Sequence, residues 1–283
     1  MKIGVVTKLR RADFVPTLKA VLDWLRDRGC QIIVEDRAVD EFCLEGVTAA
    51  ARNDLPKLSD VIIVFGGDGT LLSVARLIHD SKARILGVNL GSLGFLTEIT
   101  LDELYPALDC LLQGKYSIDQ RRMLKAEVLQ DEVTTYHALN DVVISNQGAL
   151  ARIIGVKAFV DQEFVANFMA DGVIVSTPTG STAYSLSAGG PVVYPTLEAI
   201  LITPICPHTL TNRPLVIPAN SRVRLVVESG KNLMLTVDGQ KGIPLKQGDE
   251  IRCTYSEYKI ELIVPRHKSF FDVLREKLKW GER

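Results

Sequence analysis

The sequence predicts two domains: an N-terminal α/β domain of the doubly wound, Rossmann-like kind, and a C-terminal all-β domain resembling a β-sandwich. Three observations lead to this prediction. The chain has 283 residues, which is the length of about two average domains. Up to about residue 115, short apolar runs alternate with helical patterns. Beyond that point, short β-branched segments are separated by turn signals, and helical periodicity nearly disappears.

The elements of the first domain alternate between strand and helix. Apolar runs predict strands at residues 3–6, 32–34, 61–65 and 85–88. Helical spacing predicts helices at 14–25, 71–79 and 101–112, and a further element of unassigned type is expected at 47–58. The run at 61–65 is apolar on both faces, which is typical of a buried parallel strand. We therefore assign residues 1–117 to a doubly wound domain.

The second domain is predicted from strands and turns. Strands are expected at 125–129, 142–145, 153–160, 173–176, 223–228, 233–237 and 250–255. The turns between them carry Gly, Asn and Asp, as in Asp238-Gly239, which favours antiparallel pairing. We assign residues 118–268 to this domain. Helical spacing returns at 270–278, and we expect the segment 269–283 to pack back on the first domain.

Composition excludes several classes of function. The 33 basic and 34 acidic side chains leave a net charge of -1, so neither a nucleic acid nor an anionic membrane is an expected partner. No run approaches the ~18 apolar residues of a membrane span. The five cysteines are scattered without a C-x-x-C pair, which indicates neither a disulfide framework nor a zinc site. A reducing, cytoplasmic location is expected.

The strongest local motif is Gly66-Gly67-Asp68-Gly69-Thr70, which stands between an apolar strand and a helix. Its glycines let backbone N–H groups approach a phosphate at the positive end of a helix. The carboxylate of Asp68 would repel phosphate, so we expect it to accept a hydroxyl proton or to help hold a metal. The alternative is a tight turn in which Asp68 or Thr70 caps the helix.

A second loop, residues 89–95, follows the next strand and should leave the same edge of the sheet. Phe95 in this loop either contacts a nucleotide base or simply packs in the interior. Elsewhere, Asn140-Asp141 precedes a strand. An amide beside a carboxylate can bind the cis-diol of a ribose, although this pair is also common in turns.

The most unusual segment of the chain is 171–191. It combines many hydroxyl groups with a tyrosine and small residues, which suits the edges of a purine or a carboxamide. The alternative is a Ser/Thr-rich surface loop. Such a loop usually carries Lys, Glu or Asp, and none occurs between Gly172 and Pro191.

Together, the motif at 66–70, Asn140-Asp141 and the segment 171–191 resemble the bacterial type of the NAD kinase family, ATP:NAD 2'-phosphotransferases. The resemblance extends along essentially the whole chain, including 204–210 and 237–240. The glycine motif alone is shared with lipid kinases, whereas Thr-Pro-Thr-Gly-Ser-Thr-Ala-Tyr at 177–184 is far more specific.

The resemblance implies a kinase that binds NAD between an α/β domain and a β-domain and forms homodimers or homotetramers. It implies ATP or another phosphoryl donor, a divalent metal such as Mg²⁺, and Asp68 as acceptor of the 2'-hydroxyl proton. No side-chain metal ligand is assigned. Gly66, Gly67, Gly69 and Thr70 would form the phosphate-donor loop. The implied NAD contacts are Asp68, Gly69, Asn140, Asp141, Arg152, Asp171, Thr182, Ala183, Tyr184, Ser185, Leu186, Ser187 and Gln240.

One departure from the family pattern and two rival functions accompany this prediction. The family usually has Asn-Glu where this chain has Asn140-Asp141, so the Asp141 carboxyl must reach one methylene further. A lipid or sugar kinase with the same glycine motif is the first rival, and a non-catalytic dinucleotide sensor is the second. A nicotinamide oxidoreductase fits poorly, because no G-x-G-x-x-G opens a βαβ unit.

Overall fold

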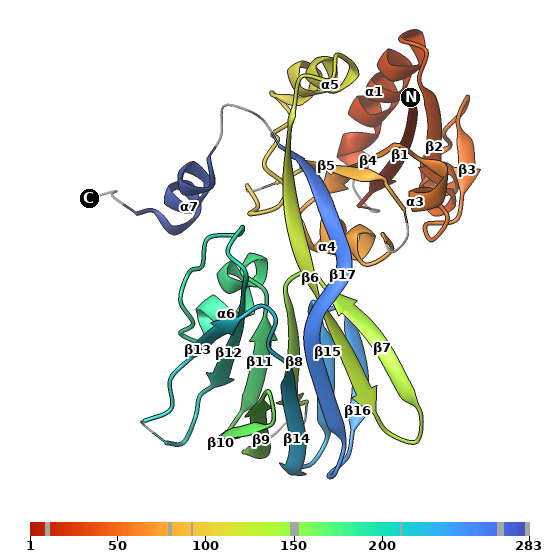
Figure 1. The fold of residues 1–283 in the computed structure, drawn as a ribbon. Helices are drawn as coiled ribbons and strands as arrows, with labels where there is room; N and C mark the ends of the chain where they lie inside the picture. Colours follow the sequence, from red (N-terminus) through yellow and green to blue (C-terminus); the bar gives the residue numbers. More distant parts are fainter. Residues whose placement is uncertain are drawn as a thin grey trace. The chain divides into compact units, whose positions relative to one another are not determined.

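The computed structural model describes residues 1–8, 12–78, 81–91, 93–147, 153–209, 211–264 and 269–280. The chain forms two compact units. Unit 1 comprises Met1–Gln120 and Ile260–Arg283, and unit 2 comprises Arg121–Lys259. Two long strands, β6 (Ser117–Leu129) and β17 (Glu250–Val264), have their two ends in different units (Figure 1). The boundary expected at residue 268 differs from this division, because Leu262 and Ile263 of β17 already pair with β5 in unit 1.

Unit 1 contains a parallel sheet in the order β3-β2-β1-β4-β5, with the end of β17 beyond β5. This order is that of a doubly wound nucleotide-binding fold, and it confirms the predicted α/β class. The predicted strand at 61–65 is fully buried, as expected for a central parallel strand. The strands are β1 (Lys2–Thr7), β2 (Gln31–Glu35), β3 (Thr48–Ala50), β4 (Val61–Gly66) and β5 (Arg84–Asn89).

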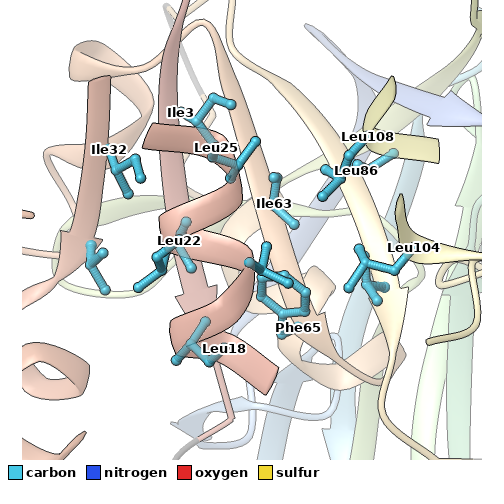
Figure 2. Close-up of a cluster of buried hydrophobic side chains, with 14 of the residues drawn as sticks. Ile3, Leu18, Leu22, Leu25, Ile32, Ile63, Phe65, Leu86, Leu104 and Leu108 are labelled. Carbon is cyan, nitrogen blue, oxygen red and sulfur yellow. The ribbon is translucent and has the colours of Figure 1, made fainter. Parts of the chain in front are cut away.

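Helices cover both faces of this sheet. On one face, helix α1 buries Leu18, Leu22 and Leu25 against Ile3 and Ile63 (Figure 2). On the other face, Leu71 of α4 comes so close that a Cβ on Gly87 would lie 2.9 Å from its side chain. The helices are η1 (Ala12–Phe14), α1 (Val15–Asp27), α2 (Asp36–Phe42), α3 (Leu55–Leu58), α4 (Asp68–Ala75), α5 (Leu104–Leu112) and α7 (Phe270–Leu278). None of the helices in the described ranges is long and apolar enough to cross a membrane.

Unit 2 is a sandwich of two antiparallel sheets, which confirms the predicted β-rich domain. One sheet has the order β13-β12-β11-β8-β15-β16, and the other contains β10-β9-β14-β17 with β6 and β7. Apolar residues of both sheets fill the space between them, for example Val142 and Val173 from the first and Val156 and Leu225 from the second. The remaining strands are β7 (Val133–Ala138), β8 (Asp141–Asn146), β9 (Ile154–Val160), β10 (Glu163–Ala170), β11 (Gly172–Ser176), β12 (Ala199–Ile205), β13 (Leu215–Pro218), β14 (Val223–Ser229), β15 (Leu233–Val237) and β16 (Lys241–Leu245).

Two local differences bear on function. Helix α4 begins at Asp68, three residues before the predicted start, so most of the glycine motif belongs to the helix. The Ser/Thr-rich segment forms two helical turns, η2 (Thr179–Thr182) and α6 (Tyr184–Ser187), rather than a loop. Hydroxyls of these turns donate to backbone carbonyls three residues earlier, as Ser181 does to Pro178 at 2.6 Å. Because polar bonds of this kind hold the turns, the sequence shows no apolar helical periodicity there.

Candidate functional site

The predicted phosphate loop lies at the carboxyl edge of the sheet in unit 1. Strands β4 and β5 run parallel with Gly66 opposite Asn89, so the loops that follow them leave the same edge. Within the described residues no side chain caps α4, and the predicted alternative of a cap by Asp68 or Thr70 is wrong. The N-terminus of a helix carries a partial positive charge, which suits a bound anion.

Close packing requires a glycine at Gly66, and none of the motif's glycines has an unusual backbone conformation. Gly66, Gly67 and Gly69 all lack a positive φ. A Cβ on Gly66 would lie 2.4 Å from the Thr70 hydroxyl, so this position needs glycine. A Cβ on Gly67 would meet no atom within 4 Å, which leaves open space beside the N-terminus of α4.

The carboxylate of Asp68 is held by the loop that follows β5. Its Oδ2 accepts a hydrogen bond from the N–H of Phe95 at 2.9 Å. Its Oδ1 accepts bonds from the N–H groups of Leu96 at 3.0 Å and Thr97 at 3.1 Å, and from the Thr97 hydroxyl at 3.1 Å. Within the described part of the chain Oδ2 thus accepts a single bond where Oδ1 accepts three, which leaves a lone pair on Oδ2. The remaining lone pair can receive a hydroxyl.

Gly94 makes this arrangement possible. A Cβ at this position would lie 2.0 Å from Asp68 Oδ1 and 2.4 Å from Thr97 Oγ1. The local sequence pattern does not reveal the importance of Gly94 or Thr97, because each contacts a residue 26 or more positions away in the chain. Phe95 contributes its backbone N–H to Asp68, and its side chain is half-buried. A contact between that side chain and a base stays a prediction.

In unit 2, Asn140 and Asp141 are held from one side by Asp238. The Asp238 carboxylate accepts bonds from the N–H groups of Leu139 at 3.2 Å, Asn140 at 2.8 Å and Asp141 at 3.3 Å. Asp238 belongs to the turn between β15 and β16, which also contains the exposed Gln240. Asp238-Gly239 is predicted as a turn and as part of the resemblance at 237–240, whereas the hydrogen bonds that Asp238 accepts from residues 139–141 are seen only in the structure.

The Ser/Thr-rich segment holds the same residues from the other side. The Thr177 hydroxyl donates to the Leu139 carbonyl at 2.6 Å, and the Thr177 N–H donates to the Asn140 carbonyl at 2.9 Å. The N–H of Gly180 donates to Thr177 Oγ1 at 3.0 Å. A Cβ on Gly180 would lie 2.1 Å from the Asn140 oxygen, so glycine is required for this approach. The fold thereby brings three predicted motifs of unit 2 together.

The side chains of η2 and α6 divide into inward and outward groups. The Ser185 hydroxyl is buried and lies 2.9 Å from the Thr203 hydroxyl of β12, so it fastens α6 to the sheet. Tyr184 is 46% exposed, and Ser187 is exposed beside it. Thr182, Ala183 and Leu186 are half-buried. The outward group offers an aromatic ring and a hydroxyl to a ligand.

Two predicted contact residues stand apart from this group. Asp171 precedes β11, whose other end, Ser176, pairs with Asp141. Five residues of extended chain separate Asp171 from Ser176 by about 16 Å, so Asp171 does not belong to the cluster around Asn140. Arg152 lies outside the described residues.

Asp141 has an unusual environment for a carboxyl group. It is 4% exposed, and burial raises its pKa from 3.8 to about 7, with repulsion from Asp238 as the second cause. Ser176 lies directly opposite on β11 and projects to the same face of the sheet. The buried Ser176 hydroxyl has no hydrogen-bond partner in the described ranges.

The raised pKa makes stability depend on pH. Between pH ~4 and ~7 the folded chain keeps a proton on Asp141 that the unfolded chain has released. The stabilisation of the folded state by this proton is therefore fully present below pH ~4 and is lost as pH rises through ~7. We expect Asp141→Asn to lose less stability than the wild type between pH 5 and pH 8, as measured by urea unfolding. Asp131→Asn, at a side chain 97% exposed, is the control. Equal pH dependence in wild type and Asp141→Asn would contradict this assignment.

Comparison with known proteins identifies the family of both parts of the chain. Residues 3–116 match the family model of the ATP-NAD kinase N-terminal domain, and residues 139–264 match that of the C-terminal domain. The chain is 47% identical over 285 residues to the NAD kinase of Geotalea daltonii, covering 100% of this chain and 99% of that one. It is 42% identical over 283 residues to the NAD kinase of Solibacter usitatus, with coverages of 99% and 98%.

Two solved structures share the fold. Yeast NADH kinase complexed with NADH superposes with a TM-score of 0.91 at 27% identity, covering 100% of this chain and 89% of the yeast chain. An NAD kinase from Archaeoglobus fulgidus in complex with ATP superposes with a TM-score of 0.81 at 25% identity, covering 99% of this chain and 100% of that chain. The two ligands in these structures are a dinucleotide and a nucleoside triphosphate.

Proposed function

Because this chain belongs to the NAD kinase family, we propose that it transfers the γ-phosphoryl group of ATP to the 2'-hydroxyl of the adenosine ribose of NAD, with Asp68 as proton acceptor. The observation that carries the proposal is the Asp68 carboxylate, which three backbone N–H groups and one hydroxyl hold at the edge of the sheet. Its Oδ2 keeps a lone pair for the ribose hydroxyl.

The chemistry fits such a site. Phosphoryl transfer passes through a loose transition state, so positioning and charge stabilisation supply most of the catalysis. Asp68 orients the hydroxyl and accepts its proton late in the transfer. The donor phosphates would lie against the N-terminus of α4, with Gly66, Gly67, Gly69 and Thr70 around them.

A magnesium ion agrees with the residues present. In the described ranges no three His, Cys, Asp or Glu side chains gather into a ligand cluster. Mg²⁺ usually keeps several waters and is held largely by substrate phosphates, so it would bind together with the donor, and no side-chain ligand is assigned to it. Bound with the donor, the ion would neutralise phosphate charge, which matters in a motif without a lysine.

We propose that unit 2 binds the dinucleotide. Asn140 and Asp141 would hold a ribose. Asp171 and Arg152 would contact a more distant part of the dinucleotide. The other contacts would come from Thr182, Ala183, Tyr184, Ser185, Leu186, Ser187 and Gln240, together with Gly69 of unit 1. Support comes from the hydrogen bonds of Asp238 and Thr177, which hold Leu139, Asn140 and Asp141 in one geometry. Unit 1 would handle the donor, and unit 2 would bind NAD.

Further proposals concern assembly and location. A homodimer or homotetramer is proposed from the family resemblance, and size-exclusion chromatography with light scattering tests it. Location in the cytoplasm is proposed because all five cysteines are free, as suits a reducing compartment. Neither a nucleic acid nor a membrane is proposed as partner, since the net charge of -1 provides no basic excess.

The test of the function is a coupled assay for NADP with Mg–ATP and either NAD or NADH. We expect NADP or NADPH to form at a rate proportional to enzyme concentration. A parallel reaction with radiolabelled ATP, NAD and a diacylglycerol shows which acceptor becomes labelled. Labelled lipid with unlabelled dinucleotide would contradict the proposal, and absence of any transfer with intact NAD binding would favour a sensor.

Gly94→Ala should lower kcat about tenfold to a hundredfold, because the new methyl group displaces the Asp68 carboxylate from its N–H donors. The matched control is Gly91→Ala in the same loop, where a Cβ would meet only Asn89 Oδ1 at 3.9 Å. The measurement is kcat for NADP formation, with the melting temperature of each variant beside it. Equal kcat in the two variants would show that the position of Asp68 tolerates the methyl group.

A further inference from the structure

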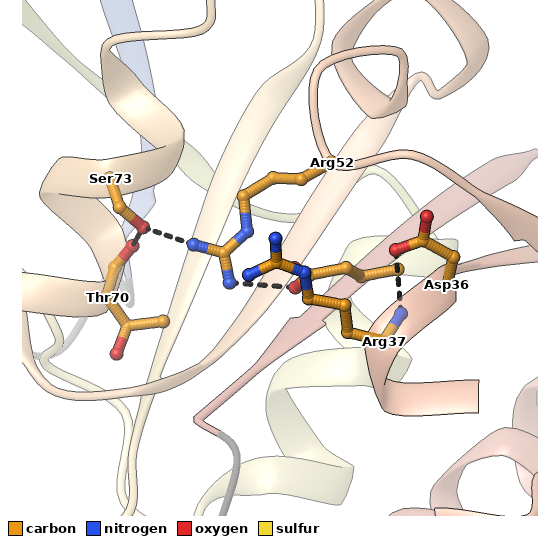
Figure 3. Close-up of polar contacts among 6 residues, drawn as sticks. Asp36, Arg37, Arg52, Thr70 and Ser73 are labelled. Atoms are coloured by element: carbon orange, nitrogen blue, oxygen red, sulfur yellow. Dashed lines mark hydrogen bonds and ion pairs between the residues drawn. The ribbon is translucent and has the colours of Figure 1, made fainter. Parts of the chain in front are cut away.

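A second set of polar contacts reaches α4 from a different part of unit 1 (Figure 3). The guanidinium of Arg52, between β3 and α3, donates from Nη2 to Glu35 Oε2 at 2.7 Å and from Nη1 to Ser73 Oγ at 3.0 Å. Ser73 lies in α4, and its hydroxyl donates to the Thr70 carbonyl at 2.6 Å. One side chain therefore connects the end of β2 with the helix that carries Asp68.

The buried carboxylate of Glu35 holds Arg52 in place. The Glu35 side chain is only 4% exposed, whereas that of Arg52 is 32% exposed. A buried carboxylate depends strongly on its partner, because removal of the partner leaves an uncompensated charge. Two of the donors in the planar fork of Arg52 are engaged in two directions, so the guanidinium has a defined orientation.

Helix α4 needs such outside support. It has eight residues, and a helix this short is not stable by itself. In the described residues no side chain caps its start, since Asp68 turns its carboxylate toward residues 95–97 instead. The Ser73 bond to Thr70 competes with regular helical bonding in the first turn. Besides the burial of Leu71 and Leu72, polar contacts through Asp68 and through Ser73 thus hold that turn.

We propose that Arg52 is a positioning residue for phosphoryl transfer: through Ser73 it fixes the first turn of α4, and thereby the direction of the Asp68 carboxylate. Arg52 acts through Ser73 and does not itself touch the reacting atoms. The inference rests on the proposed role of Asp68. The effect passes along the helix: the contact at Ser73, five residues after Asp68, determines how well the Asp68 carboxylate meets the acceptor hydroxyl.

Ser73→Ala is the sharpest test, because it cuts the connection to α4 and leaves the Glu35–Arg52 pair intact. We expect kcat for NADP formation to fall about tenfold, with the KM for NAD within about twofold of wild type, since an ångström of misplacement affects the transition state more than binding. Ser73→Thr keeps the hydroxyl and should restore most of kcat. Wild-type kcat in Ser73→Ala would overturn the proposal.

Arg52 itself is tested in a double variant. Arg52→Met alone would bury an unpaired Glu35, so it is combined with Glu35→Gln to remove both charges. We expect this variant to fold and to show the low kcat of Ser73→Ala. The matched control is Arg84→Met, because Arg84 makes a similar 2.9 Å ion pair with Glu261 in the same unit. That variant should lose some stability and keep its kcat. If Arg84→Met loses as much kcat as the double variant, reduced stability alone explains the loss.

Amide hydrogen exchange separates this inference from the proposed function, because it needs no turnover. In Ser73→Ala, the amides of residues 70–75 should exchange about tenfold faster than in wild type, and those of α1 should be unchanged. Unchanged exchange in α4 would overturn the positioning role even in an active enzyme. Faster exchange in a protein that makes no NADP would uphold the contact and refute the transfer reaction.

Discussion

Replacing Asp68 with asparagine should lower kcat for NADP formation about 10²-fold to 10⁴-fold, the usual contribution of a positioned proton acceptor. The asparagine oxygen can still accept the three bonds made to Oδ1, from Leu96 N–H, Thr97 N–H and the Thr97 hydroxyl. Its NH₂ group cannot accept from Phe95 N–H or take a proton from a ribose hydroxyl. The measurement is steady-state kcat beside the Kd for NAD by calorimetry.

Binding and folding are the controls for this prediction. The Kd for NAD should change less than about tenfold, because unit 2 contributes most of the proposed contacts. The melting temperature should fall only slightly, since a single hydrogen bond to the loop is lost. A variant that retains wild-type turnover would remove Asp68 from the chemistry and leave it as a structural residue of the loop.

Gly180→Ala should weaken NAD binding about tenfold or more and lower the stability of unit 2 by about 1–3 kcal/mol. The added Cβ would lie 2.1 Å from the oxygen and 2.5 Å from the carbonyl carbon of Asn140, and backbone atoms cannot move aside as a flexible side chain can. Either Asn140 or the turn at 179–182 must shift. Calorimetric titration with NAD and a thermal melt measure the two effects.

Gly242→Ala provides the comparison for Gly180→Ala. It places a Cβ in the same unit, where the nearest atom is the sulfur of Met234 at 3.1 Å, at the flexible end of a side chain. We expect NAD affinity close to wild type for this variant. If both alanine variants bind NAD equally well, the close approach of the Ser/Thr-rich segment to Asn140 does not matter for the dinucleotide.

The sequence predicted the α/β class of unit 1 well because its signals are local. A strand buried on both faces must be apolar throughout, and 61–65 shows this directly. Helix α2 and strands such as β10 and β16 were missed, since their half-exposed residues mix polar and apolar types without a clear period. Propensity cannot distinguish such segments from loops.

The candidate site was predicted unevenly for a similar reason. Asp68 and Asn140 stand in short motifs whose spacing carries chemical meaning. Asp238 and Gly94 are essential to the arrangement, yet each acts on a residue 26 or more positions away. Nothing in the local pattern distinguishes Asp238 from the acid of an ordinary Asp-Gly turn.

The amino-acid sequence by itself determined which residues of this protein can do chemistry: a carboxylate among glycines, an amide beside a second carboxylate, and a segment of hydroxyls without charge. Only the tertiary structure decided how they are oriented. Parallel pairing of β4 with β5 brings the 95–97 amides onto Asp68, and antiparallel pairing of β8 with β11 and β15 places Asn140 between Thr177 and Asp238. Hydrogen bonds and steric contacts act between neighbours in space, and strand pairing makes neighbours of residues far apart in the chain.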